Sequence, residues 1–110
     1  MLVKLETSNP KRGFVLVLLV QFIVKPAMQE QVKTYLRKME EHSRKEPGCR
    51  LYIASQSNEN SRKFCIYEQY DDEAARDAHR AAPYFAEYVT NGFVPLTESI
   101  VRETFTTISG

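Results

Sequence analysis

The sequence feature that most restricts the possible folds of this chain is its longest apolar run. Residues 14–24 read Phe-Val-Leu-Val-Leu-Leu-Val-Gln-Phe-Ile-Val and are followed at once by Lys25 and Pro26. A membrane-spanning helix needs about 20 apolar residues, and this run is shorter and is interrupted by Gln21. Its β-branched and aromatic side chains favour a strand covered on both faces. We therefore predict a buried strand and no membrane-spanning segment.

Composition fits one domain and excludes several classes of protein. The chain has 110 residues, of which 43% are hydrophobic, enough to fill a single core. Lys and Arg number 15 and Asp and Glu 14, a balance that argues against an electrostatic nucleic-acid or anionic-membrane binder. Residues 1–13 show no sustained period, so we expect a flexible N-terminal extension before a single domain over residues 14–110.

The two cysteines are expected to be free thiols. Cys49 and Cys65 stand in no CxxC motif, and neither has a histidine at the spacing of a zinc ligand. A small secreted scaffold that depends on disulfides would need more cysteines. The pattern indicates a protein of the reducing cytoplasm and predicts no metal site.

The next segments read as a helix and a hairpin. Pro26 suits a helix start, and Pro47 with Gly48 suits its end. Between them, apolar and aromatic side chains recur at the steps of one helical face. These are Met28, Val32, Tyr35, Leu36, Met39 and His42. Residues 49–57 and 63–70 alternate like strands, and the turn-forming residues 58–61 between them predict a hairpin.

The last third of the chain completes a split β-α-β order. Asp71 and Asp72 offer an N-cap to a second helix, Pro83 opens a third short one, and Asn91-Gly92 is expected to end it. Residues 98–108 are predicted to form a final strand. The order β-α-β-β-α-(α)-β is that of ferredoxin-like α+β proteins, with helices on one face of a four-stranded antiparallel sheet. The other face is also apolar, which predicts a homodimer joined through the sheets.

His79 and Glu68 are the strongest candidates for chemistry. His79 falls on the inner stripe of its helix beside Ala75, Ala78 and Ala82, and such small neighbours would leave room for a ligand. A hydrogen-bonded core histidine is the alternative. Glu68 alternates in phase with apolar side chains, so this carboxylate needs a partner or a ligand. If the two meet, Glu68 would orient the imidazole and raise its pKa.

Further polar and aromatic side chains are candidates for contact with a small-molecule substrate. Gln21 is a lone amide in the apolar first strand and could bind a substrate carbonyl or hydroxyl, or satisfy a core polar group. Tyr67, Tyr70 and Phe85 are expected to line the same pocket, with plain core packing as the alternative. His42 is expected to pack or to interact with the end of its helix.

An ordered set of short motifs resembles the antibiotic biosynthesis monooxygenase family. The motifs are Val24-Lys-Pro26, Glu46-Pro-Gly-Cys49, Phe64-Cys-Ile-Tyr-Glu-Gln-Tyr70, Asp72-Glu-Ala-Ala-Arg-Asp-Ala-His79 and Ala82-Pro-Tyr-Phe85. The likeness covers about residues 14–108. It implies a dimeric α+β barrel and, in some members, oxidation of quinols or phenols with O2 and no cofactor. In such an enzyme His79 would take the phenolic proton, and Glu68 would orient it.

The resemblance leaves other functions open. A related branch isomerises a phosphorylated autoinducer-2 sugar, for which Lys25, Arg62 and Arg80 are candidate phosphate ligands. A non-catalytic binding dimer of the same fold is a third reading. Haem degradation is disfavoured, because the chain has no Trp and carries Val89 about where that branch has its histidine.

The chain also departs from the family pattern at three positions. Ala27 replaces the glycine of a Lys-Pro-Gly turn, and Tyr70 stands where several members have Trp. Gln21 replaces a carboxylate or Asn found in some members. Glutamine cannot act as a base, so the departure speaks against a catalytic role at that position.

Overall fold

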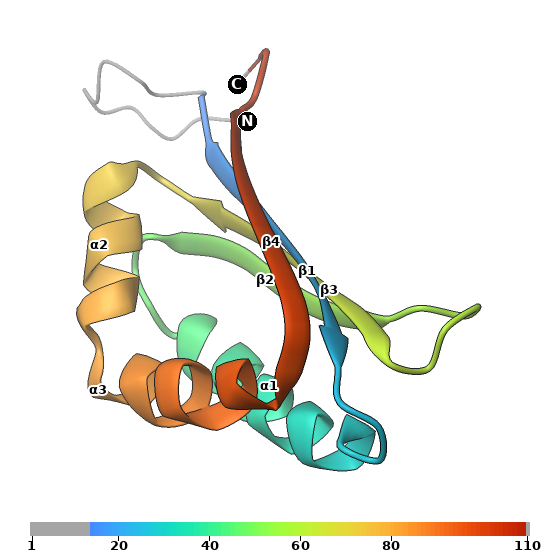
Figure 1. Ribbon diagram of the computed structural model, residues 1–110. Helices are drawn as coiled ribbons and strands as arrows, with labels where there is room; N and C mark the ends of the chain where they lie inside the picture. The colour runs from blue at the N-terminus through green and yellow to red at the C-terminus, as the bar shows by residue number, and fades with distance from the viewer. Residues whose placement is uncertain (1–13, 110) are drawn as a thin grey trace.

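The computed structural model describes residues 14–109 and builds one antiparallel sheet with helices on one side (Figure 1). The predicted extension over residues 1–13 lies outside the described residues. In chain order the elements are β1 (Leu16–Val24), α1 (Gln29–Ser43), β2 (Cys49–Gln56), β3 (Lys63–Tyr70), α2 (Glu73–Ala81), α3 (Pro83–Phe85), the π-helical segment η1 (Ala86–Phe93), the 3-10 segment η2 (Val94–Leu96) and β4 (Thr97–Thr106).

The sheet has the order β2-β3-β1-β4, which confirms the ferredoxin-like α+β prediction. β1 pairs antiparallel with β3 on one side and with β4 on the other. The most apolar segment of the chain therefore forms an inner strand, where both of its edges are hydrogen-bonded. No helix among residues 14–109 is long and apolar enough to cross a membrane.

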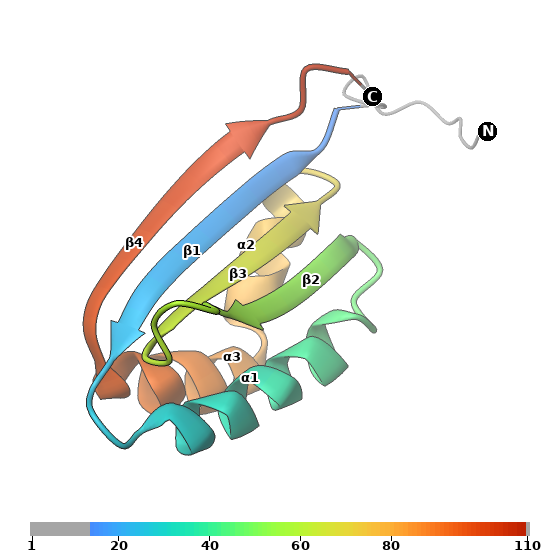
Figure 2. The same cartoon turned by 90° about the vertical axis from the view of Figure 1, so that its right-hand side faces the viewer.

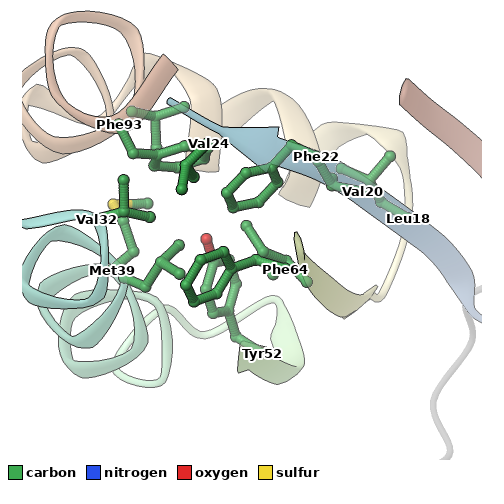
Figure 3. Packing of buried hydrophobic residues seen from close by; sticks show 12 residues of the cluster. Leu18, Val20, Phe22, Val24, Val32, Met39, Tyr52, Phe64 and Phe93 are labelled. Atoms are coloured by element: carbon green, nitrogen blue, oxygen red, sulfur yellow. The ribbon is translucent and has the colours of Figure 1, made fainter. Parts of the chain in front are cut away.

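One face of the sheet and the inner faces of the helices form the core. Even-numbered side chains of β1, such as Val20, Phe22 and Val24, meet Val32 and other residues of α1 and η1 (Figure 3). The Phe22 ring lies 5.7 Å from the Phe64 ring centroid and 4.9 Å from that of Phe93. The predicted helical stripe is thus the core-facing stripe of α1, although the helix ends at Ser43 and not at Pro47.

The predicted helix end at Asn91-Gly92 is wrong. The helical path continues through η1 and η2 as far as Leu96. Gly92 is buried there, and a Cβ added to it would lie 3.1 Å from the Tyr35 ring. This glycine permits close approach of η1 to α1, and tertiary packing overrides its tendency to end a helix.

The opposite face of the sheet carries an exposed apolar surface. Among the described helices, none lies on this side, and Figure 2 shows it towards the viewer with α2 behind β3. Odd-numbered residues of the strands point this way, as the register of the sheet requires. The larger exposed ones are Ile53 at 41%, Tyr67 at 36%, Val101 at 65% and Phe105 at 44% exposure.

The turn between β1 and α1 holds a strained alanine. Ala27 has a φ angle of 69°, in the left-handed region that favours glycine. Here the chain reverses direction, and the backbone N–H of Met28 donates to the carbonyl of Lys25 at 3.2 Å. The replacement of the glycine in a Lys-Pro-Gly turn therefore costs conformational energy at this position.

We expect Ala27→Gly to raise the free energy of unfolding by about 1 kcal/mol, because glycine adopts a positive φ without steric penalty. Urea denaturation measures the change. Ala74→Gly is the matched control, since Ala74 is exposed within α2. There the same exchange should lower stability by about 1 kcal/mol. Equal signs for the two variants would contradict the argument.

Candidate active site

A cavity of about 100 Å³ lies between α2, the helical face of the sheet and the α3–η1 segment. Most of its wall is apolar, and the polar part comes from α2, β3 and β4. The lining side chains are Leu18, Val20, Tyr52, Ile66, Glu68, Arg76, His79, Arg80, Phe85, Val89, Phe93, Ile100 and Arg102. The space is large enough for several water molecules or a small ring.

His79 is presented to this cavity by the last turn of α2. The helix begins where the Asp72 carboxylate accepts a hydrogen bond from the backbone N–H of Ala75 at 2.9 Å, an N-cap that the sequence predicts. His79 lies two turns further on and is only 3% exposed. The cap and the helix therefore place the imidazole inside the protein.

The Glu46 carboxylate holds the imidazole. Nδ1 of His79 lies 3.0 and 3.1 Å from the two oxygens of Glu46, and the Tyr84 hydroxyl also donates to that carboxylate. A carboxylate accepts hydrogen bonds, so Nδ1 carries the proton and donates it to Glu46. In a neutral ring the lone pair is then on Nε2, which faces Glu68 at 4.0 Å.

The expected pairing of Glu68 and His79 is therefore met only in part. The two side chains do lie together, but 4.0 Å exceeds hydrogen-bond distance, and Glu46 takes the orienting position. The expected rise in the pKa of His79 is also wrong, because burial lowers that pKa and Glu46 only opposes the effect. His79 is thus held as a neutral base.

Glu46 is a residue of the candidate site that the sequence patterns did not indicate. It follows α1 in a turn, 33 positions before His79, and no local pattern links the two. The signal was the Glu-Pro-Gly-Cys motif. Gly48 has no Cβ, and one added there would lie 2.4 Å from the Cβ of Ala75, so the glycine allows this turn to pack directly on α2. That contact brings the carboxylate to the imidazole.

Aromatic rings surround His79, and the predicted alanine stripe is only partly on its side of α2: Ala75 packs against Gly48 and Ala82 is half-buried. Ala78 is exposed on the outer side of α2. The ring centroids of Tyr70, Phe85 and Tyr52 lie 5.2, 5.4 and 5.8 Å from that of the imidazole. Bulky residues fill the neighbourhood, so the room for a ligand is on the Nε2 side of the ring, within the cavity.

Glu68 is a buried acid that can exist in either protonation state near neutral pH. It projects from β3, is 3% exposed, and accepts a hydrogen bond from the Tyr70 hydroxyl at 2.5 Å. Burial raises the pKa of Glu68 from 4.5 to about 7, although the Tyr70 hydrogen bond and the charge of Arg76 act in the other direction. The same burial raises the pKa of Tyr70, so its hydroxyl stays a hydrogen-bond donor.

The other predicted site residues divide between the two faces of the sheet. Phe85 lines the cavity, and Tyr70 contacts both Glu68 and His79. Gln21 pairs with Cys65, and Tyr67 pairs with Leu19, in the β1–β3 register. All four are odd-numbered, and the odd-numbered side chains of these strands point away from the helices, so Gln21 and Tyr67 lie on the opposite face of the sheet. The prediction that Gln21 and Tyr67 line this pocket is therefore wrong for a single chain.

The three predicted phosphate ligands, Lys25, Arg62 and Arg80, do not meet at one place. Arg80 lines the cavity, whereas Lys25 donates to the carbonyl of Pro95 at 3.0 Å and Arg62 to that of Val24 at 3.1 Å. His42 stacks on Tyr84 outside the cavity, at 4.5 Å between ring centroids.

Within residues 14–109, no three His, Cys, Asp or Glu side chains are grouped so that they could hold a metal ion.

Together these groups can exchange a proton with a molecule in the cavity. A neutral imidazole presents Nε2 to an apolar space, its other nitrogen is fixed by a carboxylate, and a second carboxyl that titrates near pH 7 lies beside it. This is the equipment of general acid–base catalysis.

Comparisons with known proteins agree with this fold. A family model described as antibiotic biosynthesis monooxygenase matches residues 15–91. The crystal structure of PA3566 from Pseudomonas aeruginosa has a TM-score of 0.81 and 25% identity and covers 88% of this chain and 97% of that one. A Bacteroides thetaiotaomicron protein, whose provisional name is antibiotic biosynthesis monooxygenase, has a TM-score of 0.79 and 30% identity, over 86% of this chain and 90% of that one.

A curated relative is also similar. The uncharacterized protein sll1783 of Synechocystis is 35% identical over 66 residues, which are 60% of this chain. The match spans 45% of that relative, so the chain corresponds to about half of its length.

The raised pKa of Glu68 predicts how stability changes with pH. A carboxyl with a folded-state pKa above its unfolded value favours folding when protonated, and this contribution is lost as the pH rises from 4.5 to about 7. We expect the free energy of unfolding of the native chain, relative to Glu68→Gln, to fall by up to about 3 kcal/mol between pH 4.5 and 8. Urea denaturation across this range measures it. A constant difference would show that Glu68 ionises as freely as an exposed glutamate.

Proposed function

The chain belongs to the antibiotic biosynthesis monooxygenase family, and we propose that it is a cofactor-independent monooxygenase that oxidises a small quinol or phenol with O2. The observation that carries the proposal is the orientation of His79. Its Nδ1 is fixed by Glu46, and its Nε2 faces Glu68 across a mostly apolar cavity, beyond hydrogen-bond distance, and is free to accept a proton.

In this proposal His79 starts the reaction by taking the phenolic proton. Burial keeps the imidazole neutral at neutral pH, so Nε2 is available as a base, and Glu46 stabilises the imidazolium that forms. The phenolate donates electrons to O2 far more readily than the phenol does. Glu46 is a positioning residue here, and His79 is the group that touches the substrate.

In the rest of the reaction the substrate itself reduces O2, and the protein contributes an apolar wall and one further acid. A quinol and O2 give a hydroxyquinone and water, so one oxygen atom enters the ring and the other leaves as water. The apolar wall formed by Val20, Ile66, Phe85 and Phe93 excludes solvent from the reduced oxygen species. Glu68, which titrates near neutral pH, can return a proton to the departing oxygen.

A second function is supported by the same site. His79 and Glu68 could shuttle a proton between neighbouring carbons of a phosphorylated sugar, as an isomerase would. The observation that favours it is positive charge in the cavity, where Arg80 is joined by Arg76 and Arg102. A non-catalytic binding dimer is the third reading, and the experiment below separates it from both enzymes.

The exposed apolar face is proposed to join two copies of the chain. Ile53, Tyr67, Val101 and Phe105 lie on one side of the sheet and are 36% to 65% exposed. A monomer rarely leaves a continuous apolar sheet face in water. Packing of two such faces would produce the α+β barrel typical of the family, and Gln21 would then lie in the interface. Two free thiols, Cys49 and Cys65, accord with a cytoplasmic protein.

We expect metal-stripped protein to consume O2 with at least one member of a panel of reduced quinols, above the rate of autoxidation. His79→Ala should lower this rate by about 100-fold or more, because the general base is lost. An oxygen electrode measures the rate. His42→Ala is the matched control and should retain activity, because His42 lies outside the cavity, stacked on Tyr84.

The outcomes separate the candidate functions. A folded His79→Ala protein that retains full O2 uptake would refute the proposed mechanism. If the native chain consumes no O2 with any quinol but isomerises a sugar phosphate, the second function replaces the first. If it does neither, the protein is a binding dimer.

Size-exclusion chromatography with light scattering tests the dimer. We expect twice the chain mass of 12.7 kDa for the native protein, and the monomer mass for Val101→Lys, since a lysine there would be buried against the second sheet. Thr90→Lys is the control, because Thr90 is exposed on η1 at the helical side. A native chain that elutes as a monomer would contradict the proposal.

A further inference from the structure

The cavity beside His79 carries more positive charge than proton transfer requires. Its charged lining consists of three arginines, Arg76, Arg80 and Arg102, and one carboxyl, Glu68. The arginines approach from two directions: α2 supplies Arg76 and Arg80, and β4 supplies Arg102. In Figure 1, α2 lies to the left of the sheet and β4 is the edge strand at its front.

Arg76 is the most constrained of the three. It precedes His79 by three residues and so lies on the same face of α2. Its Nε is buried and has no hydrogen-bond partner among residues 14–109. A buried N–H without an acceptor destabilises the folded chain, and a charged group does so more strongly. This donor has no acceptor among the described residues, and the Arg76 side chain lines the cavity, so a ligand there can pair with its guanidinium.

Arg102 completes the positive lining from the far side. It stands opposite Val20 in the β1–β4 register, and this row of the sheet faces the helices. The side chain therefore projects into the same cavity from β4, a strand that is exposed along most of its length. Arg80 lies at the rim, and its guanidinium already donates to Asp77 at 2.7 Å.

Glu68 offsets this charge only in part: burial raises its pKa to about 7 and outweighs the charges of Arg76 and Arg102, which lower that pKa. The structure records no ion pair within 4.0 Å between Glu68 and any arginine of the described residues, and the hydrogen bond that Glu68 accepts comes from Tyr70. Asp77 partly offsets Arg80 only, and Glu46 is engaged by His79 and Tyr84. Two guanidinium groups, those of Arg76 and Arg102, are left to face the cavity.

We propose that the ligand of this cavity carries an oxyanion, either a carboxylate or a phosphate, which Arg76 and Arg102 bind while an apolar ring lies against Phe85 and His79. Guanidinium groups bind both oxyanions through paired, charge-assisted hydrogen bonds. The inference rests on the proposed function in one respect, because both assign the ligand to the cavity at His79. It adds the chemical class of that ligand.

Matched pairs of small probes test the inference without turnover. The carboxylate pair is 4-hydroxybenzoate and 4-hydroxybenzyl alcohol, and the phosphate pair is phenyl phosphate and phenol. We expect the native chain to bind one anionic probe at least about tenfold more tightly than its neutral counterpart, the effect of one or two charge-assisted hydrogen bonds. Isothermal titration calorimetry measures the dissociation constants. Which pair shows the preference distinguishes a carboxylate from a phosphate ligand.

Charge-removing variants locate the site. Arg76→Gln and, independently, Arg102→Gln should each abolish the preference for the anionic probe. Arg102 lies on an exposed strand, so its variant tests the site even if Arg76→Gln folds poorly. Arg37→Gln is the control with the same loss of charge, because Arg37 is exposed on α1 and lines a different groove; it should retain the preference.

The results also separate this inference from the proposed function. Equal binding of charged and neutral probes, or a preference that both variants retain, would overturn the oxyanion site even if O2 uptake depends on His79. A preference lost in both variants would support it even if no quinol consumes O2, and then only the oxygenase proposal fails.

Discussion

The burial of β1 is the constraint on which the rest of the structure depends. Its inner face packs on α1 and η1, and its two edges pair with β3 and β4. An antiparallel sheet with a central strand this apolar cannot leave either face in water without a large free-energy cost. The helices cover one face. The other remains apolar over Val101 and Phe105, so the same property of one segment shapes both the core and the proposed dimer.

The polar cluster around His79 is stable because its members satisfy one another. Buried polar groups cost free energy unless they are hydrogen-bonded. His79 and Tyr84 both donate to Glu46, and Tyr70 donates to Glu68. Burial then acts in opposite senses on the two titratable groups of the cavity. It lowers the pKa of His79 and raises that of Glu68 to about 7, so a neutral base faces an acid that can hold or release its proton.

The site explains why one fold can serve more than one reaction. Acid–base groups and an apolar wall suit proton removal from either a phenol or a sugar carbon. The two proposed reactions differ in the molecule that enters, and Arg76 and Arg102 are the charged lining residues proposed to bind it. On these proposals, ligand selection depends on the charges of α2 and β4, and proton transfer depends on the contact between α2, β3 and the turn that follows α1.

Local patterns in the sequence were sufficient to predict the four strands, the core face of α1, the N-cap at Asp72 and the placement of Glu68 on the inner face of β3. Each depends on residues a few positions apart, where periodicity and turn chemistry operate. The sequence also singled out His79 with Glu68, Tyr70 and Phe85 beside it, but it did not indicate the hydrogen-bonding partner Glu46. Contact of His79 with Glu46 requires Gly48 to pack on Ala75. The positive lining of the cavity requires β4 to lie beside β1. The continuation of the helical segment η1 past Gly92 requires α1 to pack against it. These are contacts between segments distant in the chain, and only the tertiary structure decides them, because no local pattern encodes which distant surfaces meet.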